Sequence, residues 1–104
     1  MTDKRIVLTT AGSSDEARRI AEALVERRLA ACVNIVSKIV SIYRWQGEVE
    51  EAEEWMLLIK TAVPFERVRD AILEMHPYEL PECISIAIEG GSGEYLKWLV
   101  DSVE

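Results

Sequence analysis

A long β-rich stretch, Ala31 to Trp45, constrains the fold of this chain more than any other part of it. Apolar and β-branched residues dominate the stretch, and Ser37-Lys38 interrupts it, which predicts one long strand with a bend or bulge near Ser37. Gln46-Gly47-Glu48 predicts a turn, and Glu54–Thr61 predicts the returning strand. The remaining elements therefore have to be arranged around a long central β-hairpin.

Two helices are predicted by their starting signals. Ser13 occupies an N-cap position and Glu16 follows three residues later, which is the pattern of a capping box. Apolar residues then recur at helical spacing, and Arg27 and Arg28 fall in the predicted last turn, where cations favour the helix dipole. Pro64 predicts the first turn of a second helix, because proline is pre-organised for that position.

The predicted elements follow the order βαββαβ, with a short C-terminal helix after them. This order is that of the ferredoxin-like unit, an α+β fold. Right-handed crossovers place both main helices on one face of a four-stranded antiparallel sheet and leave the other face bare. Because the hairpin is apolar on both alternations, packing several copies together is the simplest way to cover it. The elements outside the hairpin are the strands Arg5–Thr10 and Cys83–Ile88, helices over 13–28 and 64–75, and a helix over 92–103.

The composition bounds the class of protein. A length of 104 residues predicts one domain, 1–104. The net charge of -7 argues against a nucleic-acid partner, which would require a basic surface. No apolar run approaches the ~20 residues that span a bilayer, and no signal-peptide pattern follows Met1, so we expect a cytoplasmic protein without a membrane partner. Cys32 and Cys83 form no C-x-x-C motif and are expected to be reduced, buried and not paired with each other.

The segment His76–Glu82 is the strongest candidate for a functional site. It contains the only histidine, two of the three prolines, one tyrosine and two glutamates. Pro77 and Pro81 stiffen the backbone and exclude a helix, and rigid loops commonly present functional side chains. Two roles are open for His76: a ligand for a divalent ion or an acid–base group, or a cap at the end of the preceding helix.

Other candidate side chains have two open interpretations each. Tyr78 and Glu79 either orient His76 and a ligand or stabilise the turn. Lys60, at a strand end, either faces the same cleft, where it binds an anion or pairs with Glu79, or is an ordinary exposed lysine. Trp45 and Trp55 either line a ligand pocket or pack at a subunit interface, where tryptophan is enriched. No nucleophile motif or P-loop is present, so an enzyme would rely on His76 as acid or base, and we expect a non-enzyme.

Five motifs together resemble the divalent-cation-tolerance protein CutA family, in order and over nearly the whole chain. The resemblance implies a ferredoxin-like fold, a tight homotrimer related in architecture to the PII signalling proteins, and an association with tolerance to copper and other divalent cations. The motifs are Ala30-Ala31-Cys32-Val33-Asn34-Ile35, Tyr43-x-Trp45-x-Gly47, Ile59-Lys60-Thr61, His76-Pro77-Tyr78-Glu79-x-Pro81-Glu82 and Tyr95-Leu96-x-Trp98.

The sequence departs from some family members at a proposed copper site. Some bacterial members, those with a proposed copper site, carry a cysteine at the end of the first strand and a His-His pair before Pro-Tyr, where this chain has Thr9, Met75 and His76. A single imidazole with oxygen donors makes a weak site, so no cofactor is obligatory and copper or another divalent cation is the expected ligand. The predicted assignments are His76 and Glu79 as metal ligands, Trp45, Lys60, Tyr78 and Glu82 at an inter-subunit cleft, and Tyr43 and Trp55 at the interface.

Two alternatives to the tolerance function remain open. One is a PII-like trimer that binds a small ligand in signalling or acts as a scaffold for other proteins. The other is a small-molecule enzyme in which His76 transfers a proton, with Tyr78 or Glu79 as its partner.

Overall fold

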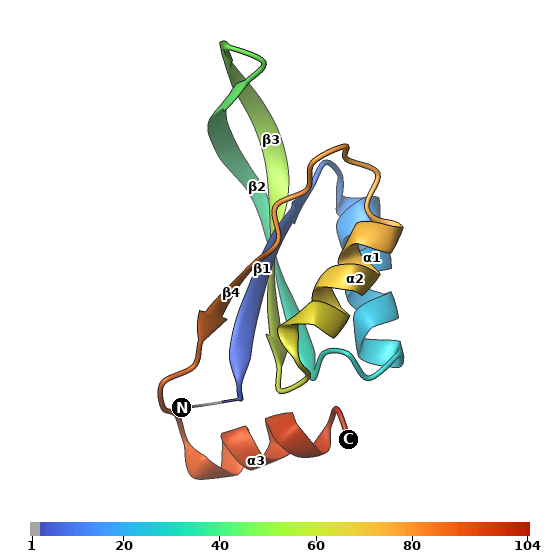
Figure 1. The fold of residues 1–104 in the computed structure, drawn as a ribbon, viewed down its shortest axis with the longest axis vertical. Helices are drawn as coiled ribbons and strands as arrows, with labels where there is room; N and C mark the ends of the chain where they lie inside the picture. Colours follow the sequence, from blue (N-terminus) through green and yellow to red (C-terminus); the bar gives the residue numbers. More distant parts are fainter. Residues whose placement is uncertain (1–2) are drawn as a thin grey trace.

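The computed structural model describes residues 3–104 and has the predicted ferredoxin-like α+β arrangement with a C-terminal helix. The sheet order is β2-β3-β1-β4, and all neighbouring strands are antiparallel. Helices α1 and α2 cover one face of the sheet, and α3 lies at the end of the sheet where β1 begins (Figure 1). The elements are β1 (Arg5–Ala11), α1 (Ser14–Glu26), β2 (Cys32–Trp45), β3 (Glu48–Thr61), α2 (Phe65–Met75), β4 (Ile84–Ala87) and α3 (Gly93–Asp101).

The core lies between the sheet and the two covering helices. Strand alternation points Val7, Thr9 and Ala11 of β1 toward the helices, and all three are fully buried. Thr9 is the polar member of this row, and its Oγ1 has no hydrogen-bond partner among residues 3–104. The largest fully buried apolar side chains are Ile20, Leu24, Leu57, Ile59, Ile72, Leu99, Val7 and Val68.

The hairpin β2–β3 projects beyond the helices (Figure 1). Its two-residue turn, Gln46-Gly47, has positive φ at both positions, 51° and 84°, as a type I′ turn requires. The predicted strand Glu54–Thr61 was too short, because β3 begins at Glu48. The acidic residues before Glu54 are poor strand formers, but they pair with β2 across a ladder that reaches the turn.

A bulge interrupts β2 where it was predicted. The register with β3 shifts between Val36 and Ile39, and Lys38 adopts a φ of 57°. Before the bulge, odd-numbered residues such as Val33 pair with residues of β3 that face the helices. Beyond it, odd-numbered residues pair with residues that face the other side, because the bulge adds one residue to β2.

The helix starts were predicted better than the helix ends. The Glu16 N–H donates to Ser13 Oγ over 3.1 Å, which confirms Ser13 as the N-cap of α1. Arg27 and Arg28 follow α1 rather than forming its last turn, because Arg28 takes a φ of 58° and ends the helix. Pro64 is the N-cap of α2, one position before the predicted first turn. β4 is also shorter than predicted, with Ile84–Ala87 as its bounds.

The two cysteines lie at opposite edges of the sheet. Cys32 begins the edge strand β2, and Cys83 directly precedes the other edge strand, β4. Both thiols are partly buried and free. Burial raises the pKa of the Cys83 thiol. None of the helices in the described part of the chain is both long and apolar enough to cross a membrane.

Candidate functional site

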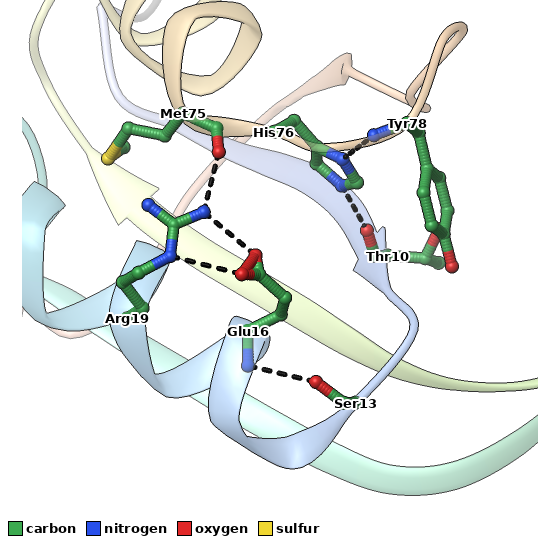
Figure 2. A network of polar contacts seen from close by, with 7 residues as sticks. All are labelled: Thr10, Ser13, Glu16, Arg19, Met75, His76 and Tyr78. Carbon is green, nitrogen blue, oxygen red and sulfur yellow. Dashed lines mark hydrogen bonds and ion pairs between the residues drawn. The ribbon is translucent and has the colours of Figure 1, made fainter.

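His76 is buried and hydrogen-bonded through both ring nitrogens (Figure 2). Its exposed fraction is 8%, and Nε2 lies 2.6 Å from the carbonyl oxygen of Thr10. The backbone N–H of Tyr78 donates to Nδ1 over 3.1 Å. Because the carbonyl only accepts and the backbone N–H only donates, the contacts fit the tautomer with its proton on Nε2.

These contacts give His76 an anchoring role. Its backbone N–H donates to the carbonyl of Ile72 over 2.8 Å and so caps α2, while its ring connects the end of α2 to the end of β1. A metal ion bound at either ring nitrogen would have to displace the Tyr78 N–H or the Thr10 carbonyl. Metal ligation by His76 therefore stays a prediction, and it carries the cost of breaking one of these hydrogen bonds.

A second set of contacts connects the start of α1 to the end of α2 (Figure 2). The Arg19 guanidinium donates to the two carboxylate oxygens of Glu16 over 2.7 and 3.2 Å, and to the Met75 carbonyl over 2.6 Å. The hydrogen bonding from Arg19 lowers the pKa of the Glu16 carboxyl group. Met75 has one of the last carbonyls of α2, which a helix leaves without internal partners, so Arg19 completes the helix end just before the loop.

Tyr78 reaches from the loop to the hairpin. Its hydroxyl donates to Oε2 of Glu54 over 2.9 Å, and only 7% of Glu54 is exposed. Burial, and then the hydrogen bond to Glu54, raise the pKa of Tyr78 to about 12. The hydroxyl passes close to Gly12, where an added Cβ would lie 2.9 Å from it, so a larger residue at position 12 would displace the Tyr78 side chain.

A cleft of about 740 Å³ lies between the hairpin and the loop that follows α2. Five predicted site residues come together there: Tyr43, Trp45, Tyr78, Glu79 and Glu82. Tyr43 and Trp45 lie beyond the bulge, in the row of β2 that shares a face with Glu54 and points away from the helices. The bulge thus places both aromatic side chains in the cleft. The remaining lining residues are Thr10, Ser41, Ile42, Arg44, Glu54, Leu80 and Pro81.

Lys60 does not line this cleft within its own chain. It pairs with Ile6 and Cys32 at the other end of the sheet, six positions along β3 from Glu54. At ~3.3 Å per residue that separation is about 20 Å, too far for an ion pair with a cleft carboxylate of the same chain. Its predicted place in a cleft between subunits therefore stays a prediction.

Two further residues lie elsewhere than their predicted roles suggested. Trp55 alternates with Glu54, points toward the helices and packs against the core of its own chain. A place for Trp55 at a subunit interface therefore stays a prediction. Tyr43 is 44% exposed and lines the cleft, which is compatible with its predicted interface role.

Glu54 is the residue that sequence reasoning missed. The sequence assigned it as the first residue of the predicted strand Glu54–Thr61, and nothing in its neighbours distinguishes it. Its burial depends on Tyr78, which comes from a loop 24 positions later. The only signal was its position at the boundary between the glutamate-rich and apolar parts of β3.

The fold and site define a class: ferredoxin-like α+β proteins with a projecting hairpin and a cleft on the sheet face opposite the helices. The family model for the CutA1 divalent ion tolerance protein matches residues 5–102, so this chain belongs to the CutA1 family. The Thermus thermophilus divalent-cation tolerance protein CutA is 50% identical over 97 residues, which cover 92% of this chain and 94% of that protein.

Solved structures agree with this assignment. The CutA crystal structure from Xylella fastidiosa has a TM-score of 0.95 and 38% identity, covering 99% of this chain and all of that one (100%). The Archaeoglobus fulgidus structure, described as a periplasmic divalent cation tolerance protein, has a TM-score of 0.93 and 42% identity, with 97% and 99% coverage. The matches span only 58% of the Xenopus laevis relative and 47% of the human one. An Arabidopsis thaliana relative is described as chloroplastic.

Proposed function

We propose that the protein is a cytoplasmic homotrimer that takes part in divalent cation tolerance and binds divalent cations, copper among them, weakly at the cleft. The observation that carries this proposal is that the cleft gathers three carboxylates, Glu54, Glu79 and Glu82, in a member of a family named for divalent ion tolerance. Carboxylate oxygens are ordinary ligands of divalent cations. The names of the relatives describe tolerance rather than a catalysed reaction, so we propose no enzyme activity.

Weak binding is the form of metal site that the residues support. No group of three or more histidine, cysteine, aspartate or glutamate side chains within residues 3–104 is arranged to hold a metal ion. Glu79 is exposed and free to bind a cation without breaking a contact of the fold, whereas His76 is bonded at both nitrogens. We therefore propose Glu79 as the first ligand, with His76 joining only if its hydrogen bonds are displaced.

Apolar side chains without cover support the trimer. Large apolar residues are half exposed or more along the hairpin and on β4, which is unusual for a chain that remains single in water. A closed ring of copies would bury them, and it would also bring a second chain toward the cleft. These side chains are Val40, Ile42, Val49 and Ile84, with exposed fractions of 61%, 69%, 65% and 51%.

Copper titration by calorimetry tests the metal site, after light scattering has established the assembly. Light scattering should give about three times the chain mass of 11.8 kDa. Glu79→Gln should weaken copper binding about tenfold, a loss of about 1.4 kcal/mol. Glu51→Gln makes the same charge change on the same chain outside the cleft, and it should bind copper as the parent does. Equal binding by all three proteins would remove the cleft as the metal site.

His76→Asn separates the two predicted ligands in the same titration. Asparagine can still accept from the Tyr78 N–H, so the loop keeps one of its two anchors. If copper binding is unchanged in this variant, His76 is not a ligand and its role is anchoring. A loss as large as that of Glu79→Gln would make His76 a ligand.

The size of the cleft favours a second candidate function. A volume of about 740 Å³ is that of a small-molecule site rather than of a single ion. A PII-like trimer that binds a small ligand, in signalling or as a scaffold, is therefore the better supported alternative. An enzyme that uses His76 as acid or base is less well supported, because the His76 ring does not line the cleft.

A further inference from the structure

Glu54 is a buried carboxylate without a cationic partner. Its exposed fraction is 7%, and its hydrogen bond comes from the neutral hydroxyl of Tyr78. The ion pairs among residues 3–104 are Asp3–Lys4, Glu16–Arg19, Asp70–Arg69 and Asp101–Lys97, and none of them includes Glu54. A buried charge is costly unless an opposite charge compensates it, so this wall of the cleft favours a cation.

Aromatic residues from two segments of the chain line the same cleft as this carboxylate. Tyr43 and Trp45 belong to β2, and Tyr78 belongs to the loop after α2, and all three line the cleft. The Tyr78 hydroxyl donates to Glu54 over 2.9 Å, and Tyr43 lines the same cleft. Aromatic faces attract cations, and they also cover the apolar part of an organic molecule.

The charged residues that line the cleft also favour a cation over an anion. Three carboxylates line it, Glu54, Glu79 and Glu82, against a single guanidinium, that of Arg44. Arg44 donates to the carbonyl of Gly47 in the hairpin turn over 3.3 Å, so its side chain has a partner at the tip. A negatively charged small molecule would therefore meet a net repulsion in this cleft.

We propose that the cleft binds an organic cation, with its ammonium group against Glu54 and its apolar part between the rings of Tyr43, Trp45 and Tyr78. A metal ion requires several donors around one point, whereas an ammonium group requires one carboxylate and gains from aromatic faces. The apolar lining residues Ile42 and Leu80 suit the carbon skeleton of such a ligand. The inference deepens the small-ligand candidate above and does not depend on metal binding.

Titration of the full-length protein with phenethylammonium, at neutral pH and followed by calorimetry, tests the inference. The matched neutral probe is 2-phenylethanol, which has nearly the same shape and no charge. Phenethylammonium should bind at least about tenfold more tightly than the alcohol, as for a charge-assisted hydrogen bond to a carboxylate. Glu54→Gln keeps an acceptor for the Tyr78 hydroxyl and should remove that preference, whereas Glu51→Gln should retain it. Circular dichroism and light scattering establish that both variants fold and assemble as the parent does.

Several outcomes would overturn the inference. These are equal binding of the two probes, unchanged preference in Glu54→Gln, or no binding of phenethylammonium. Trp45→Leu provides a second arm if Glu54→Gln fails to fold, since it removes an aromatic face and should weaken the cation more than the alcohol. The copper titration is independent of these results. Copper binding without phenethylammonium binding would support the metal proposal and contradict this one. Phenethylammonium binding without copper binding would support this proposal and contradict the metal proposal.

Discussion

The two halves of the β2–β3 hairpin have the same strand geometry but lie in opposite environments. In the half near the helices, Leu57 and Ile59 are fully buried, whereas Ile42 and Val49 near the turn are 69% and 65% exposed. The reason is length. A helix of 13 residues such as α1 is about 20 Å long, and a strand of 14 residues such as β2 is about 46 Å long. The covering helices therefore cannot reach the hairpin turn.

The difference teaches that apolar alternation alone does not establish burial. Alternation determines on which face of the sheet a side chain lies, and a second element has to lie over that face before the side chain is buried. The cleft occupies the boundary between the two halves, on the opposite face of the sheet. There the loop after α2 crosses to Glu54 and covers part of the hairpin that no helix covers.

Core truncation should show the largest difference between the halves. Leu57→Ala should lower the free energy of unfolding by about 2–5 kcal/mol, because it leaves a cavity under the helices. Val49→Ala on the same strand should lower it by less, because no element of the same chain covers Val49 and only neighbouring copies of the proposed trimer can pack against it. Denaturant unfolding at one fixed protein concentration measures both. A loss as large as that of Leu57→Ala would contradict the comparison, and a loss below about 0.5 kcal/mol would mean that no second copy covers Val49.

The bulge that separates the halves can be tested at Lys38. Valine is disfavoured at its φ of 57°, so Lys38→Val should cost about 1–2 kcal/mol. Lys38→Gly is the matched control, since glycine adopts this conformation without strain, and it should be neutral or slightly stabilising. Thermal unfolding measures both variants. A valine variant as stable as the parent would show that the strand does not need this conformation.

The covered half was predictable from sequence because its signals are local. Ser13 with Glu16 gave the start of α1, and His76-Pro77 gave the end of α2. The interruption at Ser37-Lys38 gave the bulge. Each of these features depends on neighbouring residues and the dihedral angles they adopt.

The candidate site was predicted only in part, because its geometry depends on distant segments. Tyr43, Trp45 and the loop residues line one cleft of the chain, whereas Lys60 lies in the other half of the sheet. Glu54 was missed, since its burial requires a loop from beyond α2. The hydrogen bond from His76 to Thr10 also joins residues 66 positions apart, and no local sequence pattern predicts it.

Thr9, on the strand β1 under the covering helices, offers a smaller test. Its hydroxyl is fully buried and has no partner among residues 3–104, so it loses hydration without gaining a hydrogen bond. Thr9→Val has nearly the same shape and should raise the free energy of unfolding by about 1 kcal/mol. Ser85→Val, at an exposed position in the edge strand β4, is the control and should have little effect. A loss of stability in Thr9→Val would show that the hydroxyl has a partner after all.

The smallest expected effect concerns Tyr78, which joins the two halves. Its pKa in the folded protein is raised to about 12 by burial and by Glu54, whereas tyrosine in an unfolded chain ionises near pH 10. Between these values the unfolded chain loses its proton first, so ionisation favours unfolding. The stabilisation from this group is therefore fully present below about pH 10 and is lost as the pH rises through about 12.

Comparison with Tyr78→Phe isolates this contribution, because all other ionisable groups are common to both proteins. At neutral pH the parent should be the more stable, since it retains the hydrogen bond to Glu54. The difference should narrow as the pH rises from about 10 to about 12. It should be small, because Tyr78 is 37% exposed and solvent screens its charge. Denaturant unfolding across this pH range measures it, and parallel curves for the two proteins would mean that the loop does not hold Tyr78 against the hairpin.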